Sequence, residues 1–93
     1  MKKFIMLGKY SLEAIKGISA LRTKKVTSII ENNKGKLEAM YMLLGVYDLI
    51  FIVEFPSVEN AIKSSVEITK LTGISFNTFP AVEVEEFDKL VGK

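Results

Sequence analysis

The sequence contains no cysteine and no histidine among its 93 residues. Without cysteine, the chain can form no disulfide, supply no thiolate nucleophile and ligate no metal through sulfur. Without histidine, it cannot build a Ser-His-Asp or Cys-His catalytic centre, a His-ligated zinc or iron site, or a haem held by histidine. We therefore expect no cofactor and no metal, and the sequence identifies no catalytic residue.

Arginine and long apolar runs are also scarce. Arg22 is the one arginine, and the formal net charge is only +2, with the lysines spread along the chain. Basic clusters with interleaved aromatics are missing, so we expect no nucleic-acid partner.

No apolar run approaches the roughly 20 residues of a membrane-spanning helix. The apolar start of the chain ends at Gly8-Lys9-Tyr10, too early for a signal peptide. We expect a cytoplasmic protein without a membrane partner.

The most informative apolar stretch is 45–55, which Pro56 closes. Side chains alternate between faces along a strand, so the odd-numbered residues Tyr47 to Phe55 share one face. Ile50 and Ile52 lie on the other face, which is therefore also apolar in its middle. A strand that is apolar on both faces should be covered on both sides. A single domain of residues 1–93 has little chain left for the second side, so a second copy of the protein is the economical cover.

The remaining chain divides into alternating strands and helices. We predict strands at Lys3–Leu7, Lys36–Leu44 and Ile74–Ala81, a short helix from Ser11 to Lys16, longer helices at Ala20–Asn33 and Val58–Thr72, and a short terminal helix opened by Glu83. Gly45 and Val46 suggest a tight hairpin connection, Gly35 suits a left-handed position after the helix, and Pro80 indicates a sheet edge.

The side chains predicted to face inward follow from the same periods. They are Val26, Ile29 and Ile30 on the first long helix and Val58, Ala61, Ile62, Val66 and Thr69 on the second. On the strand at 36–44, strict alternation puts Leu37, Ala39, Tyr41 and Leu43 on one face and Met40 and Met42 on the other.

The order of elements is βαββαβ followed by a terminal helix. With right-handed crossovers this is the α+β, ferredoxin-like plan: a four-stranded antiparallel sheet with two helices on one face. Two such sheets that cover each other's bare faces make a dimeric α+β barrel. We therefore expect a homodimer or a higher even oligomer.

Several short motifs resemble those of the GYD domain family. Gly45-Val46-Tyr47-Asp48 is similar to its Gly-x-Tyr-Asp signature, and Arg22 matches an arginine in its first helix. Gly35-Lys36 is similar to its Gly-Gly-Lys turn with one glycine lost, whereas Ser57 departs from the aspartate that commonly follows the proline. The resemblance covers nearly the whole chain and implies a dimeric α+β barrel whose activity is generally unassigned.

The same hairpin also resembles the small-molecule-binding domain of Lrp/AsnC-type regulators. That resemblance implies a turn that contributes to effector binding where subunits meet. This chain lacks their helix-turn-helix and has extra residues at Lys9–Ser19, so the GYD resemblance describes it better.

Five residues are candidates for a ligand pocket: Arg22, Asp48, Tyr47, Tyr41 and Tyr10. Asp48 is either a pocket acid or base, or a turn cap that holds backbone N–H groups, and the cap is the more frequent role. Arg22 either anchors an anionic ligand group or forms a structural pair with Asp48 between the first long helix and the sheet. The tyrosines either donate protons in a cavity or pack as amphipathic wall residues.

Two functions follow from these candidates. The first is a small-molecule-binding or regulatory homo-oligomeric module. The alternative is a cofactor-free enzyme of the dimeric α+β barrel type, similar to oxygenases or isomerases that act on small organic substrates. The sequence identifies neither the ligand nor the reaction.

Overall fold

The computed structural model describes residues 1–92, so Lys93 of the predicted domain lies outside the described residues. The element order is β1 (Lys2–Tyr10), α1 (Leu12–Lys16), α2 (Ala20–Asn32), β2 (Lys36–Met42), β3 (Leu49–Phe55), α3 (Val58–Thr72), β4 (Ile74–Ala81) and α4 (Val84–Val91). The predicted βαββαβ order with a terminal helix is confirmed. β1 is longer at both ends than the predicted Lys3–Leu7.

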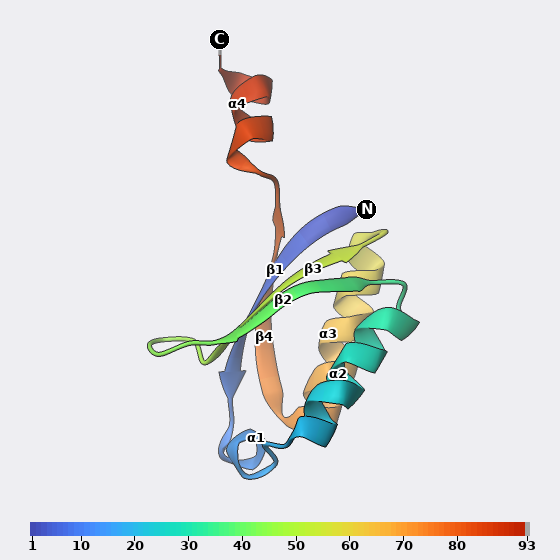
Figure 1. Ribbon diagram of the computed structural model, residues 1–93, viewed down its shortest axis with the longest axis vertical. Helices are drawn as coiled ribbons and strands as arrows, with labels where there is room; N and C mark the ends of the chain where they lie inside the picture. The colour runs from blue at the N-terminus through green and yellow to red at the C-terminus, as the bar shows by residue number, and fades with distance from the viewer. Residues whose placement is uncertain (93) are drawn as a thin grey trace.

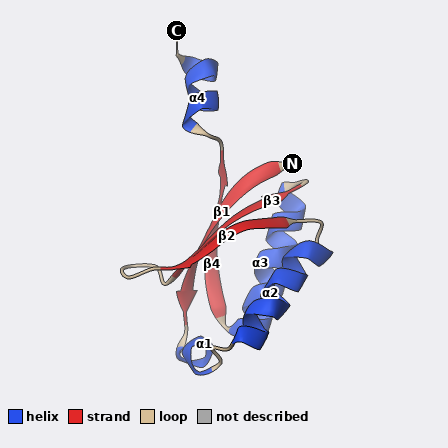
Figure 2. Cartoon of the chain, in the orientation of Figure 1, coloured by secondary structure: helices blue, strands red, loops and turns tan. Residues whose placement is uncertain are grey.

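The four strands form one sheet in the order β2-β3-β1-β4, and each neighbouring pair is antiparallel. β4, which contains Pro80, is an edge strand, as predicted. Helices α2 and α3 lie on the same face of the sheet and leave the opposite face bare (Figure 1). Figure 2 shows the same two layers coloured by secondary structure. The ferredoxin-like fold is therefore confirmed.

The core lies between the sheet and the two long helices. Leu49, Phe51, Val53 and Phe55 of β3 are all buried on this side, where they meet Phe4 and Met6 of β1 and Val26 and Ile30 of α2. Full burial of such a side chain stabilises the fold by about 1.5–3 kcal/mol. The odd-numbered face of the strand at 45–55 is therefore the core face.

Serine side chains cap the amino-terminal ends of three helices. The hydroxyl oxygens of Ser11, Ser19 and Ser57 accept hydrogen bonds from the N–H groups of Ala14, Arg22 and Asn60. Gly73 ends α3 in the left-handed conformation, with φ at 78°. These local signals need no tertiary contact, because the capping groups are neighbours in sequence.

Gly35 plays a different role from the predicted one. The left-handed residue after α2 is Lys34, with φ at 65°, and Gly35 has no positive φ. A Cβ at Gly35 would lie 2.7 Å from Cδ1 of Phe55 and 2.9 Å from Cγ2 of Ile30. The glycine is needed because the chain passes directly over a core aromatic ring, which is a tertiary reason.

The predicted tight hairpin at Gly45-Val46 is wrong. β2 ends at Met42 and β3 begins at Leu49, so residues 43–48 form the connection. The N–H of Leu43 donates to the carbonyl of Asp48 at 2.8 Å, and Gly45 has φ at 152°. This loop protrudes from the sheet (Figure 1), and Leu44 and Val46 are exposed at its tip.

The predicted faces of β2 are also wrong. The register with β3 shifts between Leu37 and Ala39, which marks a bulge. A bulge inserts one residue and exchanges the faces that follow it. Met40 and Met42 therefore pair with Phe51 and Leu49 on the helix-covered side, together with Leu37 opposite Val53.

The predicted inner stripe of α3 is wrong for Val58, Ile62 and Val66, whereas Ala61 is buried and Thr69 is half-buried. The buried residues are Ala61, Ser64, Ile68 and Thr72, while Val58, Ile62 and Val66 are exposed. Both sets recur at helical spacing, so periodicity alone cannot choose between them. The small side chains of Ala61 and Ser64 let the helix lie close to the sheet, and this contact decides the rotation.

α4 extends beyond the end of the sheet, away from the two helices that cover it (Figure 1). None of the residues Val84–Val91 is buried. Among residues 1–92, no helix is both long and apolar enough to cross a membrane.

Candidate functional site

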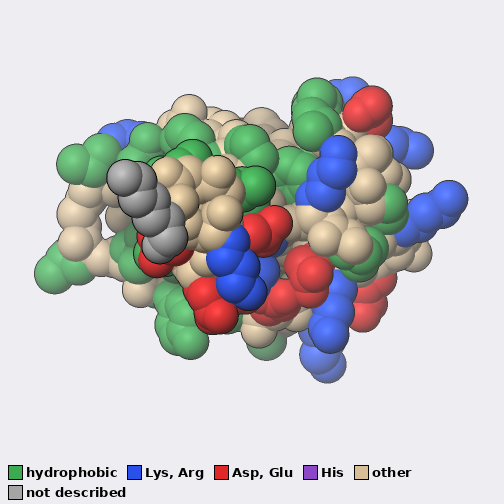
Figure 3. All heavy atoms as spheres, turned by 90° about the horizontal axis from the view of Figure 1, so that it is seen from above, with side chains coloured by type: hydrophobic (Ala, Val, Ile, Leu, Met, Phe, Trp, Pro, Cys, Tyr) green, Lys and Arg blue, Asp and Glu red, His purple; other side chains and the backbone are tan. Residues whose placement is uncertain are grey.

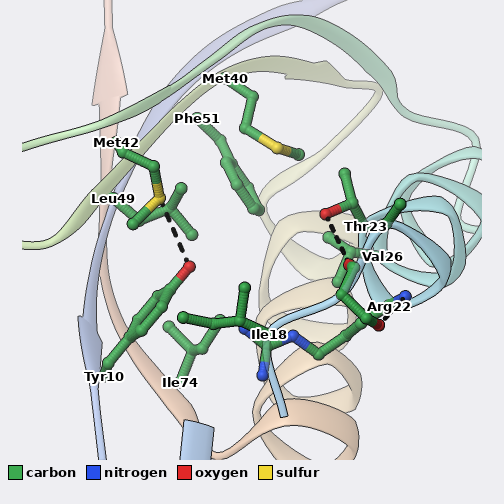
Figure 4. Close-up of a pocket in the computed structure, with 12 residues that line it drawn as sticks. Tyr10, Ile18, Arg22, Thr23, Val26, Met40, Met42, Leu49, Phe51 and Ile74 are labelled. Atoms are coloured by element: carbon green, nitrogen blue, oxygen red, sulfur yellow. Dashed lines mark hydrogen bonds between the residues drawn. The ribbon is translucent and has the colours of Figure 1, made fainter. Parts of the chain in front are cut away.

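A cavity of about 540 Å³ lies between the amino-terminal part of α2 and the sheet. Its walls come from segments that are far apart in sequence: the end of β1, the start of α2, the end of β2, the start of β3 and the start of β4 (Figure 4). Ligand pockets in proteins have volumes of about 300–1,000 Å³, so the space suits a small organic molecule.

Most of the cavity wall is apolar. The sheet contributes Met40, Met42, Leu49, Phe51 and Ile74, and the helical side contributes Ile18, Ala20 and Val26. Figure 4 shows these side chains arranged around the cavity. Methionine side chains are flexible and polarisable, so Met40 and Met42 can adapt to the shape of a ligand.

Tyr10 is a polar group at this cavity. Its hydroxyl lies 3.5 Å from the sulfur of Met42, which is a weak acceptor. No other hydrogen bond of this hydroxyl is found among residues 1–92. The hydroxyl can therefore bond to a ligand that enters the cavity.

Arg22 connects three elements at the other side of the cavity. Its guanidinium lies over the Tyr10 ring, 5.6 Å from the ring centroid, and its Nη1 donates to the carbonyl of Ala14 in α1. The side chain reaches from α2 toward Tyr10 (Figure 4). A guanidinium has five N–H donors, so the bond to Ala14 leaves donors for an anion.

Asp48 does not line the cavity. Its Oδ2 accepts a hydrogen bond of 2.9 Å from the backbone N–H of Tyr10, and its own N–H donates to the carbonyl of Gly8. The carboxylate therefore joins the hairpin loop to the end of β1. It reaches the cavity only indirectly, through the position of Tyr10.

Tyr41 and Tyr47 lie elsewhere. Tyr41 pairs with Ile50, which places it on the bare face of the sheet, and it is largely exposed. The hydroxyl of Tyr47 accepts a hydrogen bond of 3.0 Å from Nδ2 of Asn77 in β4. Of the five candidates, the fold thus brings Tyr10 and Arg22 together at a cavity and places the other three outside it.

The apolar members of the site were not among the residues predicted from the sequence. Met40 and Met42 were assigned to the wrong face because the bulge in β2 leaves no local mark in the sequence. Ile18 lies in the short connection between α1 and α2 and is exposed. An isoleucine in such a connection could have indicated a binding surface from the sequence. A large apolar residue in a short connection has no burial partner within its own segment.

None of the 12 residues that line the cavity is an acid, a histidine or a cysteine. The groups that can carry charge or move a proton are Arg22 and Tyr10. Carboxylates and imidazoles are the usual general bases of enzymes, and the lining contains neither. The arrangement is suited to holding an apolar molecule that carries an anionic or hydrogen-bond-accepting group.

A second group of polar side chains lies on the bare face, at the end where β1 begins. Lys3 Nζ lies 3.2 Å from Glu38 and 3.7 Å from Glu83. The hydrogen bond that Glu54 donates to Glu38 raises the pKa of Glu54, and the hydrogen bonds that Glu38 accepts from Glu54 and Lys3 lower the pKa of Glu38. Glu54 therefore keeps its proton to a higher pH than an isolated glutamate, and Glu38 loses its proton at a lower pH.

Residues 4–91 match the GYD domain family. The chain belongs to the GYD domain family. No curated protein matches it. This membership confirms the resemblance seen in the Gly-x-Tyr-Asp segment, and it names no reaction and no ligand.

Two solved structures share the fold of this GYD domain. The structure of FFRP-DM1 has a TM-score of 0.62 and 23% identity, with 88% of this chain and 100% of that chain covered. The leucine response regulatory protein LrpA of Mycobacterium tuberculosis has a TM-score of 0.58 and 8% identity, with 88% of this chain and 51% of that chain covered. The GYD domain therefore spans about half the length of LrpA. At these identities the similarity establishes the fold alone.

Proposed function

We propose that this GYD domain is a homodimeric small-molecule-binding module whose ligand occupies the cavity beside Arg22 and Tyr10. The observation that carries the proposal is an apolar cavity of about 540 Å³ with a guanidinium and a nearly unpaired hydroxyl at its wall. The ligand is a small, mostly apolar organic molecule with a carboxylate or another anionic group. We place the module in the cytoplasm, without a nucleic-acid partner, on the sequence arguments given above.

The bare face of the sheet supports the dimer. Ile5 and Leu7 of β1, Ile50 and Ile52 of β3, and Phe79 of β4 lie on this face, and α2 and α3 cover only the opposite one. A contiguous apolar sheet face is characteristic of an interaction surface. In a two-fold symmetric dimer, a single interface covers this face on both copies.

The regulatory character of the module is suggested by analogy only. The name of LrpA describes a response regulatory protein, and the fold that this chain shares with it covers about half of the LrpA chain. A binding domain that responds to a small molecule is consistent with that fold. The proposal that the cavity binds a small molecule rests on its lining residues and does not depend on the similarity to LrpA.

The first test is native mass spectrometry of the purified protein, compared with its denatured mass. We expect an even oligomer, and an added mass wherever a copurified ligand is retained. A library of small apolar carboxylates is then screened by thermal shift, with the uncharged amides of the same compounds as controls. Binding of neither series would overturn the proposed ligand site.

Arg22→Lys and Ile52→Glu separate the two parts of the proposal. Arg22→Lys keeps the charge and loses the planar fork, so we expect weaker carboxylate binding by about tenfold and an unchanged oligomer. Ile52→Glu places a carboxylate in the middle of the bare face, so we expect a folded monomer. Ile62→Glu on exposed α3 is the matched control and should leave the dimer intact.

A cofactor-free enzyme is the second candidate, and Tyr10 is the observation that favours it. Its hydroxyl faces the cavity with only the sulfur of Met42 as a partner, so it can donate a proton to a bound substrate. The two functions differ in their response to Tyr10→Phe. A binding module keeps its ligand with modestly reduced affinity, whereas an enzyme that uses the phenol loses turnover while substrate binding persists.

A further inference from the structure

The α4 helix has an apolar stripe that no part of its own chain covers. Val84, Phe87, Leu90 and Val91 lie on one side of the helix at helical spacing, and all four are more than half exposed. Glu86 and Asp88 flank the stripe. An isolated helix of eight residues is marginal in water, so this helix needs a partner surface.

A matching apolar patch lies at the opposite end of the molecule. Leu12 and Ile15 of α1, Ile18 in the connection and Leu21 at the start of α2 are all more than half exposed. We call these four residues the α1 patch. α1 lies at the end of the sheet opposite to α4 (Figure 1), so α4 cannot cover the α1 patch of its own chain.

The two surfaces also carry opposite charges. α4 contains Glu85, Glu86 and Asp88 with one lysine, Lys89. The stretch around the α1 patch, 12–25, contains Lys16, Arg22, Lys24 and Lys25 with one acid, Glu13. Figure 3 looks onto the end that carries α4 and shows acidic and lysine side chains beside exposed hydrophobic ones.

The charges on the bare face of the sheet are compatible with two copies that pack with opposite ends together. Lys3, Glu38 and Glu54 lie at the end near α4, and Lys9 lies at the end near α1. Lys36 lies opposite Glu54 at the same end, so Lys3 and Lys36 balance the two glutamates there and the charges permit either packing. Packing opposite ends together places Lys9 of each copy near the two glutamates, which is electrostatically favourable.

From these observations we infer that α4 docks on the α1 patch of a second copy, so that the two chains exchange their terminal helices across the dimer. The inference rests on the proposed dimer of bare faces. In the reversed packing, α4 continues from β4 past the end of its own sheet to the place where α1 of the second copy lies. Each copy donates one helix and receives one, as two-fold symmetry requires.

The groove beside α3 is the competing destination for α4. Val58, Ile62 and Val66 of α3 and Phe76 and Pro80 of β4 line this groove on the helix-covered side of the sheet. Glu83, which precedes α4, is instead paired with Lys3 on the bare side. The start of α4 is therefore held on the side of the sheet where the second copy lies and away from the groove of its own chain.

The exchange has a consequence for the cavity. Ile18 belongs both to the α1 patch and to the cavity wall. A helix from the second copy that packs on Ile18 therefore adjoins the cavity. Ligand binding and helix docking then stabilise the same segment, 18–22, and each should strengthen the other.

Single introduced cysteines test the inference, because the chain has no other thiol. Phe87→Cys and Ile15→Cys are made in separately tagged chains, mixed, and oxidised under mild conditions. We expect a disulfide-linked dimer that contains one chain of each kind. A disulfide forms only when the Cα atoms lie within about 7 Å, so the exact position of α4 along the patch matters. Val84→Cys and Leu90→Cys are therefore each also mixed with Leu12→Cys.

The matched control is Phe87→Cys mixed with Ile62→Cys, since Ile62 is as exposed as Ile15. A link to Ile62 in place of the α1 patch would show that α4 occupies the groove and would overturn the inference. An intact dimer in native mass spectrometry without any link to residues 12 or 15 would overturn it while the proposed dimer stands. A monomer would instead remove the dimer itself.

A chain with both Ile15→Cys and Phe87→Cys distinguishes exchange from folding back. Exchange produces a dimer closed by two disulfides, whereas folding back produces a cross-linked monomer. We expect the closed dimer, and a cross-linked monomer as the main product would contradict the exchange.

Discussion

At the scale of single residues, Ser64 is buried in α3 with a hydroxyl oxygen that has no hydrogen-bond partner among residues 1–92. A buried hydroxyl without a partner loses its hydration and gains nothing in return. We predict that Ser64→Ala raises the free energy of unfolding by about 1 kcal/mol, since it removes this group and favours the helix. Urea denaturation measures the change.

The neighbouring serine provides the control for this prediction. The Ser65 hydroxyl lies 3.1 Å from that of Thr78 in β4, so it links α3 to the sheet. Ser65→Ala should lower stability or leave it unchanged. If Ser64→Ala instead lowers the free energy of unfolding, the Ser64 hydroxyl has a hydrogen-bond partner and the prediction is wrong.

Asp48 gives a second prediction at this scale. Replacing it by alanine leaves the N–H of Tyr10 without its acceptor, so we expect the free energy of unfolding to fall by about 1–2 kcal/mol. Asp48→Asn keeps an acceptor and should cost less. If Asp48 instead acts as a pocket acid or base, Asp48→Asn would change ligand binding or turnover with little loss of stability.

At the scale of elements, we predict that α4 is a stable helix only where it has a partner. In the Ile52→Glu monomer we expect the amides of residues 84–91 to exchange with solvent at rates close to those of an unfolded peptide. In the wild-type dimer we expect them to be protected. Hydrogen-exchange mass spectrometry compares the two states, and the core strand β3 serves as the internal reference.

Equal exchange of α4 in the two states would show that the helix gains nothing from assembly. Protection in the monomer as well would show that α4 finds its partner within its own chain. Either result contradicts the exchange of terminal helices.

At the scale of the whole molecule, the Glu38–Glu54 pair makes stability depend on pH. The raised pKa of Glu54 means that its contribution to stability is full below the ordinary glutamate pKa of 4.5 and is lost as the pH rises through the raised value. The lowered pKa of Glu38 has the opposite sign: its contribution is present above 4.5 and is lost as the pH falls through the lowered value.

Glu54→Gln isolates the first of these effects. The amide keeps a hydrogen bond to Glu38 without the second charge, so the variant should gain stability over the wild type as the pH rises from 4 toward 7. Unfolding is measured at fixed protein concentration, because the stability of a dimer depends on it. If the difference in free energy of unfolding between the two proteins stays constant with pH, the raised pKa of Glu54 is contradicted.

Much of the fold was predictable because its signals are local. Serine caps, the left-handed Gly73 and the proline in the edge strand act within a few residues of themselves. The alternation from Leu49 to Phe55 also predicts its buried face correctly, since the face of a strand is a matter of parity. The errors fall where two local readings are equally good, as for the two stripes of α3.

The candidate site was predictable only in part for the same reason. Arg22 and Tyr10 attract attention as single residues, and only the fold brings the Arg22 guanidinium of α2 over the Tyr10 ring at the end of β1. The bulge in β2 then turns Met40 and Met42 toward them.

The sequence by itself determined the order of the elements, the faces of β3, and the absence of histidine and cysteine chemistry. It did so because residue type and spacing are properties of the chain alone. Only the tertiary structure decided which stripe of α3 is buried, where the cavity lies and which candidates share it. Those depend on close packing between distant segments, such as Gly35 against the Phe55 ring, and a linear pattern does not record such contacts.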